Sequence, residues 1–323
     1  MSPPVATSGV QHWWQINEFS FVAGMRLLYW LARLFGHWPF RIVLYPVLLW
    51  YMIVKPSARA ASRQYLGRLS TFNRSLGLDP GVRGQLRHFA AFGESILDKM
   101  LVWGGSFDIH SVRFHGLDLI TGQIATQRGA LLICCHLGNL ELCRVLSRYQ
   151  ASFKLTVLLH TKHAARFNQL LAQLDPDSQL NLMQVTELDP TTAVLLTEKI
   201  RRGEFVAIAG DRIPVSANPR IALTEFLGAT APFPVGPYIL ANLFQCPVYL
   251  LFSFRNGSGT EIHFEIFRRS IQLPRRGRDE ALTMFVADYA KRLEYFCQRA
   301  PLQWCNFYDF WNEAGTDGSH ASH

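Results

Sequence analysis

The sequence predicts an α/β protein in which a mixed, largely parallel sheet is flanked by helices, preceded by a membrane-associated helical region. From residue 109 onwards, apolar segments of strand length alternate with amphipathic segments of helix length. Residues 130–135 are apolar on both faces, as expected for a strand that is covered on both sides. We therefore divide the chain into a helical region (1–108), an α/β domain (109–312) and a disordered tail (313–323).

The composition favours a folded protein that contacts an anionic membrane. Of the 323 residues, 49% are hydrophobic and only 17% are charged, which excludes a disordered chain. The formal net charge is nevertheless +8. An apolar and basic chain indicates an anionic lipid surface rather than nucleic acid, so no nucleic-acid partner is expected.

The cysteine pattern predicts neither a metal site nor disulfides. The six cysteines lie mostly in apolar segments and lack the paired C-x2-C spacing of a structural zinc site, and no H-E-x-x-H occurs. We interpret them as core residues in a reducing compartment. Residues 1–9 are small and polar and do not resemble a secretory signal peptide.

The membrane-associated region contains two apolar stretches. Residues 19–35 form an amphipathic pattern in which Arg26 and Arg33 share one helix face, and residues 42–54 carry no charge. Because a helix needs roughly 20 apolar residues to cross a bilayer, the second stretch is short for a span. We expect a pair of helices that dips into the membrane in preference to a clean span.

A basic segment follows these apolar stretches, with Asp79 as the only acid before Glu94. Such a segment beside an apolar helix is typical of the cytoplasmic side of a membrane, although a solvated helix face is the alternative. Residues 83–103 are then predicted to form a further amphipathic helix. The basic residues are Lys55, Arg59, Arg63, Arg68, Arg74, Arg83 and Arg87.

The α/β pattern predicts the remaining elements in order. Strands are expected at residues 110–114, 130–135, 155–160, 205–209, 248–254 and 262–267, the last of them at an edge of the sheet. Helices are expected at residues 117–127, 140–149, 162–174, 191–202, 238–244 and 278–299.

A histidine follows the central strand, at the carboxyl end where open α/β sheets bind ligands. Gly138 lets the backbone turn into the next helix, and Asn139 is its candidate N-cap. On one continuous helix, residues five apart would point about 140° away from each other. If His136 lies in the turn and Glu141 in the first helical turn, the carboxylate can accept the imidazole N–H. This pair would make His136 a general base.

A second polar cluster occupies an equivalent position. Asp211 and Arg212 follow the predicted strand 205–209, so they lie at the same edge of the sheet as His136 and can share its cleft. A surface ion pair is the alternative interpretation.

Four segments carry a resemblance to a known family, and they occur in family order. One is the turn 210–212 (GDR), where the resemblance implies that Asp211 and Arg212 bind substrate or hold the architecture of the site. Residues 136–141 (HLGNLE) resemble the H-x4-D/E signature of the lysophospholipid acyltransferase superfamily, and the H-x-G-N-x-E form resembles its bacterial lipid A biosynthesis branch. Residues 226–237 resemble the F-x-G-x-x-A-x-x-P-x-G-P segment of that branch. The aromatic residues 303–311 resemble the terminal segment of predicted acyltransferases from aryl-polyene or xanthomonadin-type clusters.

The resemblance implies a membrane-associated acyltransferase at the cytoplasmic face of the bacterial inner membrane. It would move a fatty acyl group from acyl carrier protein or coenzyme A to a hydroxyl or amine of a lipid or amphiphilic acceptor, without a further cofactor. His136 would be the base and Glu141 its orienting partner. Backbone N–H groups near Gly138 and Asn139, or Arg212, would stabilise the oxyanion. The substrate-binding residues would be Gly138, Asn139, Asp211, Arg212, Phe226, Gly228 and Gly236.

Two other functions remain open at this point. A thioesterase or lipid hydrolase could use the same His-Glu pair on water, although no G-x-S-x-G elbow is present, and Cys134 and Cys135 are expected to be buried. A non-catalytic lipid-binding protein is the second alternative. Many lipid A enzymes have an aromatic residue where this chain has Leu140, so the acceptor stays undefined.

Overall fold

The computed structural model describes residues 37–103, 111–138, 146, 152–159, 180–184, 190–214, 219–257 and 259–311. The predicted helices at 19–35, 140–149 and 162–174 and the tail at 313–323 lie outside these residues, as do Asn139 and Glu141.

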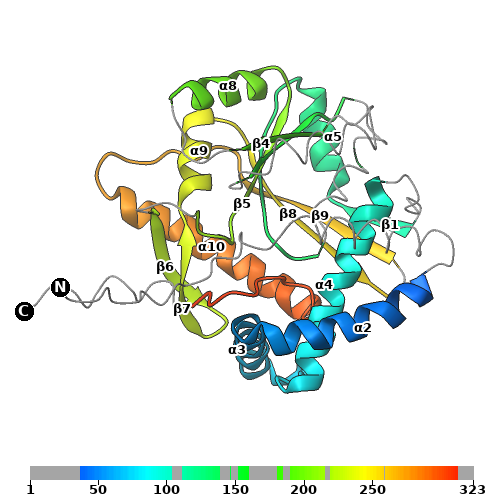
Figure 1. Cartoon of the computed structure of the whole chain (residues 1–323). Helices are drawn as coiled ribbons and strands as arrows, with labels where there is room; N and C mark the ends of the chain where they lie inside the picture. The colour runs from blue at the N-terminus through cyan, green and yellow to red at the C-terminus, as the bar shows by residue number, and fades with distance from the viewer. Residues whose placement is uncertain are drawn as a thin grey trace, which may run out of the picture.

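A seven-stranded sheet forms the centre of the molecule, in the order β1-β9-β8-β2-β5-β3-β4 (Figure 1). Every neighbouring pair is parallel except β8 and β9, so the predicted mixed and largely parallel sheet is confirmed. The strands are β1 (Val112–His115), β2 (Leu131–Cys134), β3 (Leu155–Leu159), β4 (Leu180–Gln184), β5 (Phe205–Ala209), β8 (Val248–Asn256) and β9 (Gly259–Arg268).

Helices cover both faces of this sheet. Leu131 and Ile133 of β2 belong to one buried cluster, with residues of α3, α9 and α10, whereas Leu132 and Cys134 belong to a second cluster with Ile120 of α5. This alternation explains why a covered strand is apolar at every position. The helices of the α/β part are α5 (Leu117–Ala125), α8 (Pro190–Arg201), α9 (Gly236–Phe244) and α10 (Arg278–Arg299).

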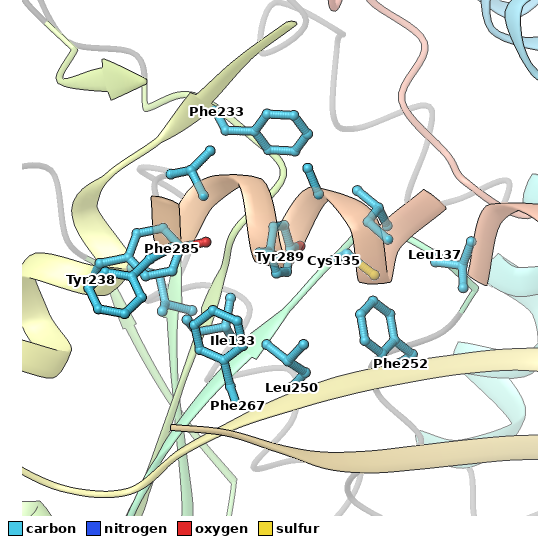
Figure 2. Close-up of a cluster of buried hydrophobic side chains, with 14 of the residues drawn as sticks. Ile133, Cys135, Leu137, Phe233, Tyr238, Leu250, Phe252, Phe267, Phe285 and Tyr289 are labelled. Atoms are coloured by element: carbon cyan, nitrogen blue, oxygen red, sulfur yellow. The ribbon is translucent and has the colours of Figure 1, made fainter. Parts of the chain in front are cut away.

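The core between the sheet and α10 is densely aromatic. Figure 2 shows Ile133, Leu250 and Phe252 of the sheet facing Tyr289 of α10. The Tyr289 hydroxyl donates to the carbonyl of Cys134 over 2.8 Å, so its one polar atom is satisfied. These contacts fix the carboxyl end of β2, where the candidate base follows.

The sequence prediction was wrong about two features of the sheet. Residues 262–267 were expected at an edge, but β9 lies between β1 and β8. Its polar residue His263 suggested an exposed face, but His263 is buried, and its Nε2 lies 2.8 Å from Oε2 of the buried Glu261. Strand β4 was not predicted at all.

The segment at 226–237 was expected to be a stiff loop but is mostly a hairpin. Strand β6 (Ile221–Phe226) pairs antiparallel with β7 (Ala229–Pro234) as a separate two-stranded sheet. Leu227 and Gly228 between them both have positive φ, 51° and 74°, as a two-residue type I′ turn requires. The prolines of β7 are tolerated because a two-stranded ribbon has an unpaired side on each strand.

Within residues 37–103, three long helices precede the sheet: α2 (His37–Val54), α3 (Pro56–Phe72) and α4 (Val82–Trp103), with a short 3₁₀ helix, η2 (Arg74–Leu76), between the last two. Leu44, Leu48 and Met52 of α2 pack into a buried cluster with α4. Within residues 42–54 of α2, the exposed large apolar side chains are Ile42, Val43, Tyr45, Val47, Leu49, Trp50, Ile53 and Val54. Within the part of the chain that the structure describes, no helix combines the length and hydropathy needed to cross a membrane.

The cysteines lie in the core, as predicted. Cys134, Cys135, Cys246, Cys297 and Cys305 are free and buried. Cys143 lies outside the described residues.

His88 connects α4 to the end of the fold and makes stability depend on pH. It is fully buried between the Ser62 hydroxyl, 2.9 Å from its Nδ1, and the Trp304 carbonyl, 3.0 Å from its Nε2. Burial lowers the pKa of His88 from 6.5 to about 4, against the opposing effect of the Trp304 carbonyl. Between these values the unfolded chain binds a proton that the folded chain does not, so stability falls as pH falls.

We expect this difference to remove about 3 kcal/mol of unfolding free energy between pH 6.5 and 4. Urea denaturation at several pH values measures it. His88→Gln, which cannot titrate, should lose less stability over the same range, and equal losses in the two proteins would contradict the assignment to His88.

Candidate active site

His136 follows β2 in a turn that is held by the C-terminal segment. Its carbonyl accepts a hydrogen bond from the backbone N–H of Cys305 over 2.8 Å, and the N–H of Gly138 donates to the carbonyl of Gln303 over 2.8 Å. Gly138 has φ +64°, and a Cβ there would lie 2.1 Å from the carbonyl oxygen of Ser253. Only glycine fits this turn, as the sequence predicted.

Asp211 is the partner of His136. Strands β2 and β5 are neighbours, with Cys134 opposite Ala209, so the residues that follow them meet at the sheet edge. The Nδ1 atom of His136 lies 2.8 Å from Oδ1 of Asp211, and Oδ2 accepts the His136 backbone N–H over 2.8 Å. His136 and Asp211 therefore lie side by side at the same edge of the sheet, as expected from the two strand ends.

The pair is buried on one side only. Asp211 has no exposed side-chain surface, whereas 29% of the His136 side chain is exposed. No described residue donates or accepts a hydrogen bond at Nε2 of His136.

The charges around the pair keep the imidazole neutral. Burial and then the Arg212 guanidinium lower the pKa of His136, against the opposing effect of Asp211. Burial raises the pKa of Asp211, but its interaction and hydrogen bonds with His136, together with the Arg212 guanidinium, bring it below the ordinary value. Because an ionised carboxylate only accepts, Nδ1 carries the proton and Nε2 carries the lone pair. This is the tautomer of a general base.

Arg212 holds the C-terminal segment against this site. Its Nε donates to Oδ1 of Asn306 over 2.8 Å, and its Nη2 donates to the carbonyl of Cys305 over 2.9 Å. These two contacts give Arg212 a structural role beside Asp211. A contact with substrate stays a prediction.

Trp304 is a site residue that sequence reasoning missed. It is fully buried, and its indole N–H donates to Oδ2 of Asp211 over 2.9 Å. Its ring packs against Tyr65 and Phe226 with centroids 5.0 and 5.3 Å away. A tryptophan in an aromatic end segment was the available signal. Such a residue is expected to be buried, and its buried indole N–H then needs an acceptor.

The remaining predicted substrate-binding residues that the structure describes make no contact with the His136–Asp211 pair that would serve their expected role. The Gly138 N–H was expected to stabilise an oxyanion, but it is already bound to Gln303. Phe226 is fully buried in the aromatic core and exposes no surface to a groove. Gly228 lies in the hairpin turn, and Gly236 begins α9, where an added Cβ would meet nothing within 4 Å.

Two hollows border the region. A groove of about 840 Å³ runs between α3 and the β6–β7 turn, where Arg63, Arg68 and Gly228 line it. A pocket of about 270 Å³ lies beside Gly138, between α4 and β8. Asp98 lines this pocket, and burial raises its pKa to about 6 although Arg255 lies close by.

The comparison with family models gives one match. The model described as bacterial lipid A biosynthesis acyltransferase matches residues 95–313, which include β2, β5 and both polar clusters. A comparison with curated proteins found no match.

Proposed function

Since the chain belongs to the bacterial lipid A biosynthesis acyltransferase family, we propose that it transfers a fatty acyl group from an acyl thioester to a lipid or amphiphilic acceptor. The donor in this proposal is acyl carrier protein or coenzyme A, and the acceptor group is a hydroxyl or an amine. One observation supports it most strongly: His136 is held at Nδ1 by buried Asp211, with Nε2 left for a substrate.

In the proposed reaction Nε2 of His136 takes the proton from the acceptor hydroxyl or amine as that group attacks the thioester carbonyl. The C–S bond of the tetrahedral intermediate then breaks. The thiolate leaves and receives the proton from the imidazolium. Asp211 stabilises the positive charge on the ring between these two transfers. Arg212 remains the proposed source of positive charge for the oxyanion.

Asp211 takes the orienting role that the sequence motif assigned to Glu141. The Nδ1 atom already has a carboxylate partner at 2.8 Å. Glu141 lies outside the described residues, so its contact with the imidazole stays a prediction. We propose that Asp211 selects the tautomer and that Glu141 adds negative charge near the same ring.

A covalent acyl-cysteine route has little support. Cys135 is fully buried beside the site, and burial together with the charge of Asp211 raises the pKa of its thiol well above 9. Such a thiol carries almost no thiolate at neutral pH. Direct attack by the acceptor is therefore the proposed route.

The proposed location is the cytoplasmic face of the bacterial inner membrane, with α2 lying at the lipid surface. Its exposed face bears Trp50 and Ile53, which are 68% and 70% exposed, and no charged residue occurs from Ile42 to Val54. The basic helix α3 follows directly. An apolar face beside arginines provides two separate attachments to anionic lipid.

Replacing both Trp50 and Ile53 by glutamate should weaken binding to anionic vesicles at least about tenfold, because two large apolar side chains no longer enter the lipid. Vesicle co-sedimentation measures this. Val194→Glu is the matched control, since Val194 on α8 is also 70% exposed. Equal binding by the double variant and wild type would show that α2 is not the attachment.

The reaction is tested by comparing the lipids of a strain that lacks the protein with those of the strain complemented by wild type or by His136→Asn. An acylated lipid that wild type alone restores supports the proposal and identifies the acceptor. Identical lipids in all three strains would contradict a lipid acceptor.

A further inference from the structure

Strands β1 and β9 carry a second cluster of ionisable side chains. His115 ends β1, and Glu261 and His263 lie two residues apart on β9, so the last two share a face of their strand. The parallel pairing of β1 with β9 sets His115 directly beside His263. Their rings stack with centroids 4.1 Å apart and an angle of 6° between the planes.

The possible ligand atoms of the three side chains lie close together. Oε2 of Glu261 lies 2.8 Å from Nε2 of His263 and 3.7 Å from Nε2 of His115. One ligand atom from each of the three residues lies within 4.8 Å of the others. Donors about 2.0–2.1 Å from a tetrahedral zinc ion are themselves about 3.3 Å apart. The observed separations bracket that value.

We infer that His115, Glu261 and His263 form a binding site for a divalent transition metal of the zinc type. Two imidazoles and one carboxylate favour zinc, cobalt or nickel over magnesium and calcium, which prefer oxygen ligands. The His115 side chain is 50% exposed, so an ion can enter from solvent and keep a water in its fourth position.

A neighbouring side chain holds one of the proposed metal ligands in position. Asn256 donates to the other carboxylate oxygen of Glu261 over 2.6 Å and orients it. Such outer contacts fix the geometry of metal ligands.

Arg299 opposes the ion. Its Nη2 donates to Oε2 of Glu261 over 2.8 Å, so it shares the oxygen that a metal would take and repels a cation. Binding is therefore weaker than this ligand set alone would give. Replacing Arg299 by glutamine removes the charge and is expected to tighten binding.

Zinc titration of the full-length protein without an affinity tag, followed by calorimetry, tests the site. His115→Ala should weaken the binding of one zinc ion at least about tenfold. The exposed position of His115 favours a folded variant, whereas His263 packs against Phe254 and Phe296. The control is His320→Ala with His323→Ala, which removes the histidines of the terminal sequence and should leave this ion bound.

A rise in the melting temperature with zinc, but not with magnesium, that requires His115 would support the inference. Tighter zinc binding by Arg299→Gln would support it independently. Zinc binding that is unchanged in His115→Ala, or absent from wild type, would overturn it, as would an Arg299→Gln variant that binds no more tightly than wild type.

Discussion

Replacing His136 by asparagine should lower acyl transfer by about 10²–10⁴-fold, the usual contribution of a general base. The amide nitrogen of asparagine takes the place of Nδ1 and can still donate to Asp211, but nothing replaces the lone pair on Nε2. The fold should therefore survive while the chemistry is lost. Initial rates with a labelled acyl thioester, together with the melting temperature, measure both effects.

The two measurements separate a catalytic role from a structural one. A large loss of rate with a melting temperature near that of wild type is expected. His136→Ala is the companion variant, and it also removes a donor from the buried Asp211, so it should be less stable than the asparagine variant. Transfer at the wild-type rate by a folded asparagine variant would refute the role of His136.

Asp211→Asn should have an effect of comparable size. The amide can still accept hydrogen bonds from the indole of Trp304 and the backbone N–H of His136. Its nitrogen, however, would face Nδ1 and favour the tautomer in which Nε2 carries the proton. A base in the wrong tautomer costs up to about 10⁴-fold in a serine protease triad, and we expect about 10²–10⁴-fold here.

The pH dependence of activity tests whether Asp211 acts as a positioning residue. Because the base must be neutral and the pKa of His136 is lowered, wild-type activity should fall with acid only below about 6.5. Without the negative charge of Asp211, the residual activity should fall at still lower pH. If the role of Asp211 were purely structural, the variant would lose activity with acid over the same pH range as wild type.

Glu141→Gln provides the comparison between the two carboxylates. The sequence motif predicts a severe loss of rate with little change in melting temperature. If Asp211→Asn keeps its activity while Glu141→Gln loses it, Glu141 is the orienting partner and the contact of Asp211 is architectural.

Much of this site could be predicted because it depends on local patterns. The apolar run before His136 predicted a covered strand, and Gly138 predicted a sharp turn. Two polar residues after strand 205–209 were expected at the same sheet edge, and Asp211 lies there at hydrogen-bond distance. Strand ends in a parallel sheet meet at one edge whatever the exact strand order.

The rest depended on contacts between distant segments. Trp304 binds Asp211 from a segment that carries no strand or helix pattern of its own. The hairpin at 226–229 requires positive φ at Leu227. A leucine in the sequence does not predict this conformation, because residues other than glycine rarely adopt it. On β9, His263 suggested an exposed edge because the residue that stacks on it, His115, lies far away in sequence.

The most direct measurement follows the label of an acyl thioester in the presence of a bacterial lipid extract, with wild type and His136→Asn side by side. With wild type, we expect label in a lipid and little in free fatty acid, and with the variant, label that stays on the thioester. Label released by wild type as free fatty acid would identify a hydrolase, and transfer by the variant at the wild-type rate would exclude His136 as the base.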